Sequence, residues 1–301
     1  RVLETGSYRS EQTGSKKASE SVGGIVRASS VLRSRYGRVY ISFEEPIRLS
    51  EYMKKLGTVE AKDLEKHSVR HVTEKLGYKI MRSIQEATVI APSTLVGTVL
   101  LSHERRGISE SRLKETAGFL VSLLVRRGIR LSASIQHRLD CHSELLEKAH
   151  TRGAHEYAAA IGDVLGELLD DGLLLIRRLL TVVEGPSDNI LVVPEKNRLE
   201  IDNYRNALLS TIAPDCIIAT ALLVMRGPVR YEDLAEECRK LSYWLRYEFI
   251  YQTDRTYEEN FGESLQSLVQ DGVIGLEDGF VQIQAPKTLN FYRTTLRHLI
   301  E

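Results

Sequence analysis

Apolar residues recur every three or four positions along most of this chain, and that spacing predicts helices. From about Leu64 onward the predicted helices follow one another, separated by Gly, Pro or polar stretches. They cover residues 64–85, 93–103, 109–127, 131–149, 155–171 and 172–183. A short strand at 189–193 then leads into a helix that begins near Ile201. The pattern therefore predicts a mostly α (α+β) fold.

One stretch near the start of the chain has a different period. Residues 38–43, RVYISF, alternate between apolar and polar side chains, which predicts a strand. Glu44, Glu45 and Pro46 follow directly. Neighbouring strand residues point to opposite faces, so the two carboxylates are poorly placed to act as an acid–base pair. Pro46 removes a ladder donor, and we interpret the three residues as the end of a strand.

The helical part contains an internal repeat, with boundaries near 91–212 and 213–301. Four pairs of segments match in the same order, namely 98–120 with 220–245, 162–172 with 262–272, 190–193 with 279–283, and 203–212 with 291–300. Each copy predicts several helices, a short hairpin and a closing helix. This order resembles a winged-helix unit, present twice.

The overall charge gives no sign of a polyanionic partner, because Lys plus Arg equals Asp plus Glu at 41 each. The first forty residues are an exception, with eight basic side chains and three acidic ones. That basic end suits a phosphorylated ligand or a membrane surface, and a solvated face explains it equally well. The helices before the two predicted hairpins, 162–171 and 262–270, carry no basic residue, so we expect no nucleic-acid binding.

The cysteines and the apolar runs bear on the cellular compartment of the protein. Cys141, Cys216 and Cys238 are few and far apart, which argues against a disulfide framework and favours a reducing compartment. No uninterrupted apolar run approaches the roughly 20 residues of a transmembrane helix. The chain begins at Arg1 without Met, and we interpret it as part of a longer protein.

Familiar catalytic patterns are missing from the sequence. The segment HRLDCH (137–142) collects possible zinc ligands, but on a helix only His137 and Cys141 share a face, and an exposed helix face explains it better. No G-x-S-x-G motif and no phosphate-binding glycine loop is present. We therefore predict no metal site, no cofactor and no catalytic residue in this chain.

The opening residues resemble membrane-associated glycerol-3-phosphate acyltransferases of the bacterial acyl-CoA-dependent and mitochondrial type. The matching positions are Gly14, Lys17, Glu20, Ser21, Tyr36, Gly37, Val39, Phe43, Glu45, Pro46, Leu49 and Tyr52. The segments 202–214 (DNYRNALLSTIAP) and 241–254 (LSYWLRYEFIYQTD) are similar to later parts of the same family. The resemblance covers most of the chain.

The resemblance implies acyl transfer from acyl-CoA or acyl carrier protein to glycerol 3-phosphate, an early step of phospholipid synthesis. The family's base is the His of a His-x-x-x-x-Asp motif, and no His in this chain has Asp five residues later. Only His142 has an acid there, Glu147, and on a helix the two lie about 140° apart. We therefore expect a C-terminal portion that is inactive alone, its substrates binding through a missing N-terminal half.

Within that interpretation, residues 1–60 end an α/β acyltransferase domain and 61–301 form a helical domain with two winged-helix-like repeats. Lys17, Lys16 and Arg1 are the candidate ligands for substrate phosphate. The structural marks of the family are Gly14, Glu20, Gly37, Phe43, Glu45 and Pro46. The resemblance also implies peripheral attachment to the cytoplasmic face of a membrane. The alternative is a non-catalytic tandem winged-helix-like module that binds a partner or nucleic acid.

Overall fold

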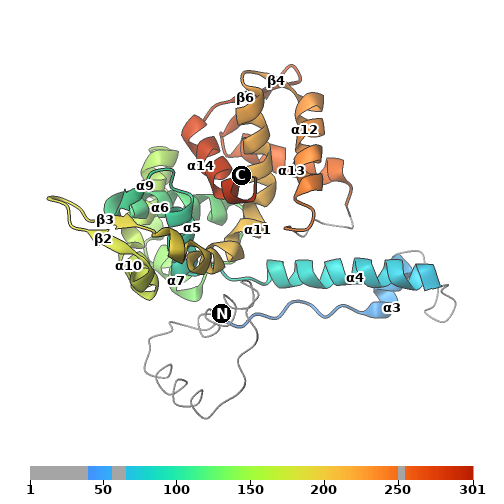
Figure 1. The fold of residues 1–301 in the computed structure, drawn as a ribbon, viewed down its shortest axis with the longest axis horizontal. Helices are drawn as coiled ribbons and strands as arrows, with labels where there is room; N and C mark the ends of the chain where they lie inside the picture. The colour runs from blue at the N-terminus through green and yellow to red at the C-terminus, as the bar shows by residue number, and fades with distance from the viewer. Residues whose placement is uncertain (1–39, 56–65, 250–254, 301) are drawn as a thin grey trace, which may run out of the picture. The chain divides into compact units, whose positions relative to one another are not determined.

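The computed structural model describes residues 40–55, 66–249 and 255–300, and most of them are helical (Figure 1). The chain divides into two compact units. Among the described residues, the first unit holds Tyr40 and Val89–Leu208, and the second holds Ile41–Thr88 and Leu209 onward. The prediction of a mostly α fold with little sheet is confirmed. The assignment of residues 1–60 to the end of an α/β domain stays a prediction.

The first unit combines eight helical segments with a small antiparallel sheet. Its elements are α5 (Pro92–Leu101), β1 (Gly107–Ser109), α6 (Glu110–Arg126), α7 (Ala133–Cys141), α8 (Ser143–His150), α9 (Ala154–Val164), α10 (Gly166–Ile176), the single 3-10 turn η2 (Arg177–Leu179), β2 (Thr181–Val183), β3 (Ile190–Val192) and the N-terminal part of α11 (Glu195–Met225). The strand order is β1-β3-β2, so the last strand lies in the centre. Leu191 pairs with Ile108 on one side and with Val182 on the other.

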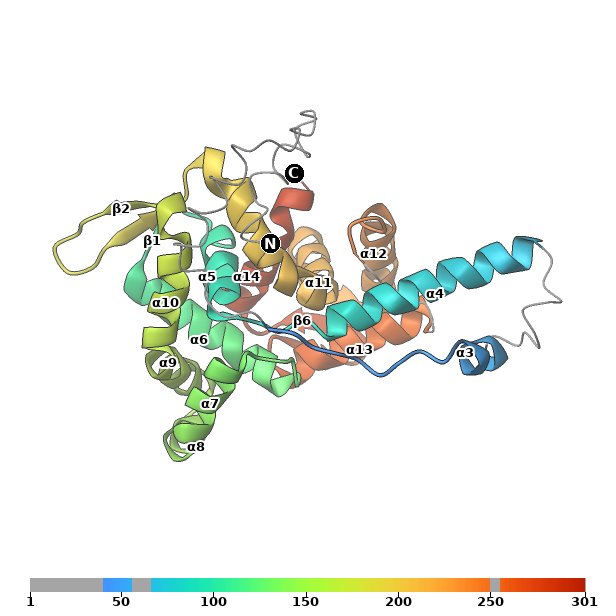
Figure 2. The same ribbon diagram turned by 90° about the horizontal axis from the view of Figure 1, so that it is seen from below.

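Close helix contacts build the core of the first unit. Helix α6 packs against α9, and α5 lies beside α10 (Figure 2). At the second contact Gly172 has no side chain, and a Cβ there would lie 2.8 Å from the carbonyl carbon of Pro92. The glycine therefore lets the backbones of α10 and α5 approach closely.

The second unit holds the remaining elements. They are α3 (Leu49–Lys55), α4 (Lys66–Glu86), the C-terminal part of α11 (Glu195–Met225), β4 (Val229–Arg230), α12 (Tyr231–Trp244), α13 (Tyr257–Gln270), β5 (Ile274–Glu277), β6 (Phe280–Ile283), α14 (Pro286–Leu296) and the 3-10 turn η3 (Arg297–Leu299). The strand order is β4-β6-β5, with the last strand again in the centre. Val281 pairs with Val229 and with Leu276.

The turn between β5 and β6 follows from its sequence. Asp278 and Gly279 have backbone φ angles of 49° and 79°, and both lie in the left-handed region. An Asp-Gly pair with two positive φ angles is the preferred two-residue connection of a tight hairpin. The hairpin predicted around 279–283 is thus present, with β6 as its second strand.

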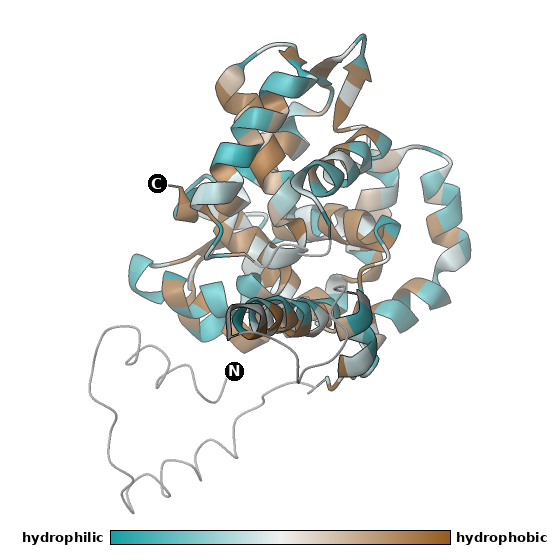
Figure 3. Ribbon diagram, turned by 90° about the vertical axis from the view of Figure 1, so that its right-hand side faces the viewer, coloured by the Kyte–Doolittle hydropathy of each residue, from teal (hydrophilic) through white to brown (hydrophobic). Residues whose placement is uncertain are grey.

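The helices are amphipathic, and hydrophilic and hydrophobic residues are mixed along most of them (Figure 3). Their buried sides hold residues such as Leu113, Leu120 and Ile161 in the first unit and Leu234, Leu265 and Leu289 in the second. Burial of these apolar faces, at about 25 cal/mol per Å², is the main term that holds each unit together.

The strand predicted at residues 38–43 is not formed within the described residues. Tyr40–Arg48 is extended without strand pairing, and α3 begins at Leu49. Ile41 and Phe43 are 76% and 87% exposed. The prediction of a strand is therefore wrong for residues 40–43, because no strand among the described residues pairs with them and their apolar side chains face solvent. Residues 38 and 39 lie outside the described part.

Three predicted helices have different limits. The one at 131–149 is interrupted at His142, which ends α7 and precedes α8. The one at 155–171 breaks at Leu165, between α9 and α10. The one at 172–183 ends before Thr181–Val183, which forms β2, as suits a run of β-branched residues.

Helix α11 is the one helix in the described ranges that is long and apolar enough to cross a membrane. Its most apolar window has a mean hydropathy of 2.0, and 67% of that window is buried inside the protein. The sequence has no uninterrupted apolar run of that length, but this helix is long and apolar enough by length and composition alone. Pro214 and Asp215 interrupt the apolar run in the sequence but do not end the helix. The burial is typical of a core helix.

Candidate functional site

The candidate phosphate ligands and the structural marks of the family fall into two groups. Arg1, Gly14, Lys16, Lys17, Glu20 and Gly37 lie outside the described residues. Phe43, Glu45 and Pro46 lie in the extended segment before α3, and all three are exposed. They do not form a cleft with one another, so the assignment of the phosphate ligands stays a prediction.

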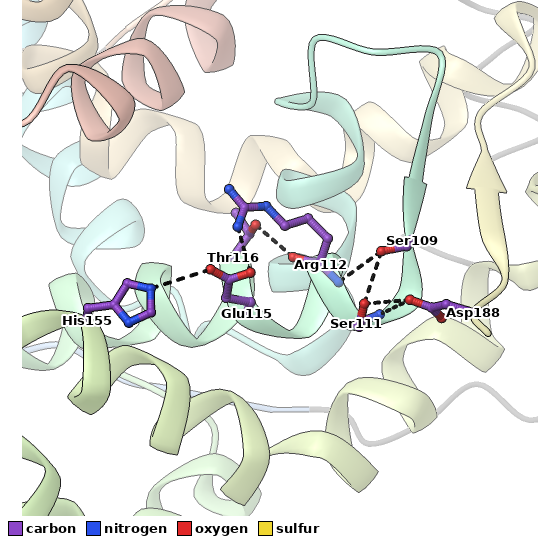
Figure 4. Close-up of polar contacts among 7 residues, drawn as sticks. All are labelled: Ser109, Ser111, Arg112, Glu115, Thr116, His155 and Asp188. Atoms are coloured by element: carbon purple, nitrogen blue, oxygen red, sulfur yellow. Dashed lines mark hydrogen bonds and ion pairs between the residues drawn. The ribbon is translucent and has the colours of Figure 1, made fainter.

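A polar network of serines and an aspartate lies where α6 begins (Figure 4). The Ser109 hydroxyl accepts a hydrogen bond from the Arg112 backbone N–H at 3.3 Å and so caps the helix. The Ser111 hydroxyl donates to Asp188 Oδ2 at 2.5 Å, and its backbone N–H donates to the same oxygen at 3.0 Å. These bonds from Ser111 lower the pKa of the Asp188 carboxyl.

This network contains Ser, His and Asp, but not in a catalytic arrangement. Figure 4 shows Ser111 pointing toward Asp188, whereas His155 points toward Glu115. His155 Nε2 lies 3.9 Å from Glu115 Oε1, and its side chain is 81% exposed. A nucleophilic serine needs an imidazole within hydrogen-bond reach of its hydroxyl. The contacts instead tie the start of α6 to the connection between β2 and β3.

The HRLDCH segment spans the end of α7. His137 Nε2 lies 3.6 Å from the Cys141 sulfur, as expected for residues four apart on a helix. The His142 ring is engaged elsewhere, with Nδ1 2.8 Å from the Arg138 carbonyl oxygen. In the part of the chain that the structure describes, no three His, Cys, Asp or Glu side chains come together as metal ligands.

A cavity of the second unit lies among α11, α12 and α13. Its volume is about 310 Å³. Apolar side chains form much of its wall, and three arginines lie at its edge. It is lined by Pro214, Ile217, Ile218, Cys238, Arg239, Ser242, Tyr243, Arg246, Arg255, Tyr257, Asn260, Phe261 and Ser264. No Asp or Glu is among these residues, and we call this cavity the α12 pocket.

The three arginines of the α12 pocket have different partners. Arg239 pairs with Glu258 and lies over the Tyr257 ring, with 4.9 Å between guanidinium carbon and ring centroid. Arg255 pairs with Glu263. Arg246 has no carboxylate partner among the described residues.

Arg246 is instead held by two tyrosines. Its guanidinium carbon lies 4.0 Å from the Tyr243 ring centroid and 4.4 Å from that of Tyr247. It also donates hydrogen bonds to the Tyr243 carbonyl oxygen at 2.8 Å and to the Tyr247 hydroxyl at 3.3 Å. Stacking on both rings restricts the side chain, and within the described ranges no carboxylate compensates its positive charge.

Two titratable groups in the wall of the α12 pocket stay neutral at pH 7. Burial raises the pKa of the Cys238 thiol to about 12. Burial is also the main cause of a raised pKa at the Tyr257 phenol, whose O–H donates to the Ala235 carbonyl oxygen at 2.8 Å. A neutral thiol is a poor nucleophile, so Cys238 contributes to the wall of the pocket as a small apolar group.

Reasoning from the sequence did not find this pocket. Its walls come from segments far apart in the chain, and its apolar residues look like ordinary core positions. The one local signal is the run YWLRY at 243–247, which puts an arginine among three aromatic residues at the end of a helix. An exposed cluster of this kind is unusual on a soluble surface.

Comparison with known proteins gives the family. The sequence model described as the glycerol-3-phosphate acyltransferase C-terminal region matches residues 8–301. A curated relative named glycerol-3-phosphate acyltransferase, from Pseudomonas entomophila (strain L48), is 28% identical over an aligned stretch of 306 residues that covers 98% of this chain and 33% of the relative. Relatives of the same name from Pseudomonas putida (strain W619) and Pseudomonas fluorescens (strain Pf0-1) are 26% and 24% identical, with the same coverage.

The chain thus spans about a third of the length of the curated relatives it matches, at 33% of each. The resemblance found in the sequence is confirmed by a match that covers nearly the whole chain. This chain belongs to the family of glycerol-3-phosphate acyltransferase C-terminal regions.

Proposed function

We propose that this chain is the non-catalytic C-terminal region of an enzyme that acylates glycerol 3-phosphate. The enzyme would take the acyl group from acyl-CoA or acyl carrier protein and supply phospholipid synthesis. The observation that carries the proposal is the family match over residues 8–301. Acyl transfer to a hydroxyl needs a base that takes its proton. The sequence lacks the His-x-x-x-x-Asp motif that supplies this base in the family, which supports a non-catalytic role for this region.

The segments at about 91–212 and 213–301 would be two winged-helix-like repeats within this region. Support comes from their common order of elements, in which a helix, a strand, further helices and a hairpin precede a closing helix. In both sheets the last strand lies between the other two. The repeats would serve protein packing, because α13 carries three acidic side chains and no basic one. A nucleic-acid ligand needs the opposite charge.

The region would also contact a membrane surface, as a peripheral protein on the cytoplasmic face. Tyr243, Trp244 and Tyr247 are 63%, 79% and 82% exposed, with Arg246 between them, and we call these four residues the aromatic ridge. Tyr, Trp and Arg are the side chains that settle at membrane interfaces, since each has an apolar body and a polar end. The ridge therefore supports membrane contact.

The proposal is tested by acyl transfer from acyl-CoA to glycerol 3-phosphate. Two proteins are compared: the 301-residue chain, and the same chain extended by the residues that its gene encodes upstream of Arg1. Transfer by the extended protein alone is the expected result. The rival interaction module is tested in parallel by retention of the chain on DNA at low salt, which the acyltransferase proposal does not predict.

A further inference from the structure

We propose that the α12 pocket binds an amphiphile with one apolar chain and an anionic head. The chain would enter the cavity between α11, α12 and α13, and the head would bind Arg246 at its edge. This site stands on the geometry of the second unit and does not depend on acyl transfer by the parent enzyme.

The size and lining of the cavity favour an apolar chain. Its volume of about 310 Å³ reaches the lower end of the roughly 300–1,000 Å³ found for small-molecule sites. Ile217 and Ile218 of α11 and Phe261 of α13 contribute apolar walls. The neutral thiol of Cys238 adds to that surface. A flexible chain that fills such a space removes apolar surface from water on both sides of the contact.

The charge at the edge of the pocket favours an anionic head. Arg239 and Arg255 already pair with Glu258 and Glu263, so their charges are largely compensated. Arg246 is not paired with a carboxylate in the described residues, and the rings of its two tyrosine neighbours hold it. A guanidinium presents a planar fork of N–H donors that matches a carboxylate or a phosphate.

Arg246 belongs both to the apolar cavity and to the positively charged edge of the site. It lines the pocket, as does Tyr243 on the preceding turn of α12. No acidic side chain is among the described residues that line the cavity, and the two nearby carboxylates, Glu258 and Glu263, are already bound to arginines. A fatty acid and a monoacyl phosphate ester share this chemistry, and their heads distinguish them.

The test is isothermal titration of the 301-residue chain with decanoate, decyl phosphate and the neutral decanol. All three are used below the concentrations at which they aggregate, and no vesicles are present. We expect one site per chain and affinities for the two anions about tenfold above that for decanol, the usual effect of one charged hydrogen-bonding partner. The tighter anion identifies the head group.

Two variants separate the head from the chain. Arg246→Gln is expected to lower the affinity for both anions by about tenfold and to leave decanol binding unchanged. Ser264→Phe fills the cavity and is expected to abolish binding of all three. The matched control is Arg293→Gln, which removes an exposed arginine of α14 that does not line the pocket and should change nothing.

The proposal is overturned if decanol binds as tightly as the anions, or if Arg246→Gln and Arg293→Gln behave alike. It is also overturned if Ser264→Phe, shown by circular dichroism to be folded, binds all three ligands like the parent chain. Arg246 is exposed, so its variant keeps the test valid even if the Ser264 variant does not fold. Failure of acyl transfer leaves these measurements unaffected, which separates this site from the proposed function.

Discussion

Gly118 of α6 and Gly162 of α9 face each other where the two helices touch. A Cβ on Gly118 would lie 2.2 Å from the Ala158 carbonyl oxygen and 2.5 Å from the Gly162 nitrogen. A Cβ on Gly162 would lie 2.8 Å from the Lys114 carbonyl oxygen. The obstacles are backbone atoms, which cannot rotate away. The contact between α6 and α9 therefore needs glycine on both sides.

Gly118→Ala should destabilise the first unit. The added methyl group forces the two helices apart, and overpacking of this kind costs about 1–3 kcal/mol. The measurement is urea unfolding of the whole chain followed by circular dichroism. Gly166→Ala is the control, because a Cβ there has no neighbour within 4 Å, and it should be neutral or stabilise by up to about 1 kcal/mol. Equal stability of the two variants would refute the close contact.

A buried ion pair should hold the N-terminal half of α11. Arg205 is 2% exposed, and its Nη2 lies 2.5 Å from Asp202 Oδ1. Asp202 is 24% exposed and Arg205 makes further contacts, so removing the carboxylate should cost less than the roughly 3–5 kcal/mol of a fully buried pair. Asp202→Ala should therefore lower the free energy of unfolding by about 2 kcal/mol.

The control for this pair is an exposed pair of the same spacing. Arg112 and Glu115 are 54% and 41% exposed, so Glu115→Ala should cost less than about 1 kcal/mol. If the Asp202 and Glu115 variants lose similar stability, the pair at Arg205 is not important for the fold. The similarity of the segment 202–214 to the family would then have a reason other than the contact between Asp202 and Arg205.

Stability should fall as the pH drops below 6.5 because of His103. Burial is the main cause that lowers the pKa of this imidazole from 6.5, and the charges of Arg105 and Arg112 add to it. The unfolded chain therefore takes up the proton at higher pH than the folded chain does. The stability that His103 contributes is complete above pH 6.5 and is lost as the pH falls toward the lowered pKa.

His103→Gln should remove this part of the pH dependence. The measurement is the difference in unfolding free energy between pH 7.5 and pH 5, taken for both proteins. The difference should be smaller in the variant, since glutamine does not titrate. An unchanged or larger difference in the variant would contradict the role of His103.

The aromatic ridge should bind anionic membranes. Replacing Tyr243, Trp244 and Tyr247 together by serine should reduce cosedimentation with vesicles of phosphatidylglycerol by about fivefold or more, since interfacial binding scales with the apolar area that is inserted. Tyr78→Ser is the control, because Tyr78 is an exposed tyrosine of α4. Equal vesicle binding by the triple variant and the control would remove the support for the membrane proposal.

Most of the helices could be predicted from the sequence because the residues that start and end a helix act locally. Ser109 caps α6, and Thr256 and Glu259 form a capping box at the start of α13. Asp278-Gly279 marks the last hairpin. The predicted helix at 131–149 is interrupted at His142, where neither Gly nor Pro marks a helix end, so the break could not be predicted from the local sequence.

The features that sequence reasoning missed depend on contacts between distant residues. A strand exists only where a partner pairs with it, and the segment that contains Phe43 has none among the described residues. The α12 pocket is formed by three helices, and nothing local relates Ile217 to Phe261. The residues proposed to bind phosphate, Lys16 and Lys17 among them, lie outside the described part and remain predictions.

The most direct test of the account is the rate at which labelled glycerol 3-phosphate is converted to its 1-acyl product. The 301-residue chain should give no product above background with acyl-CoA or with acyl carrier protein as donor. The chain extended through the coding sequence upstream of Arg1 should give product, and a His-x-x-x-x-Asp motif should lie in the added residues. Transfer by the 301-residue chain alone, or none by the extended protein, would contradict the account.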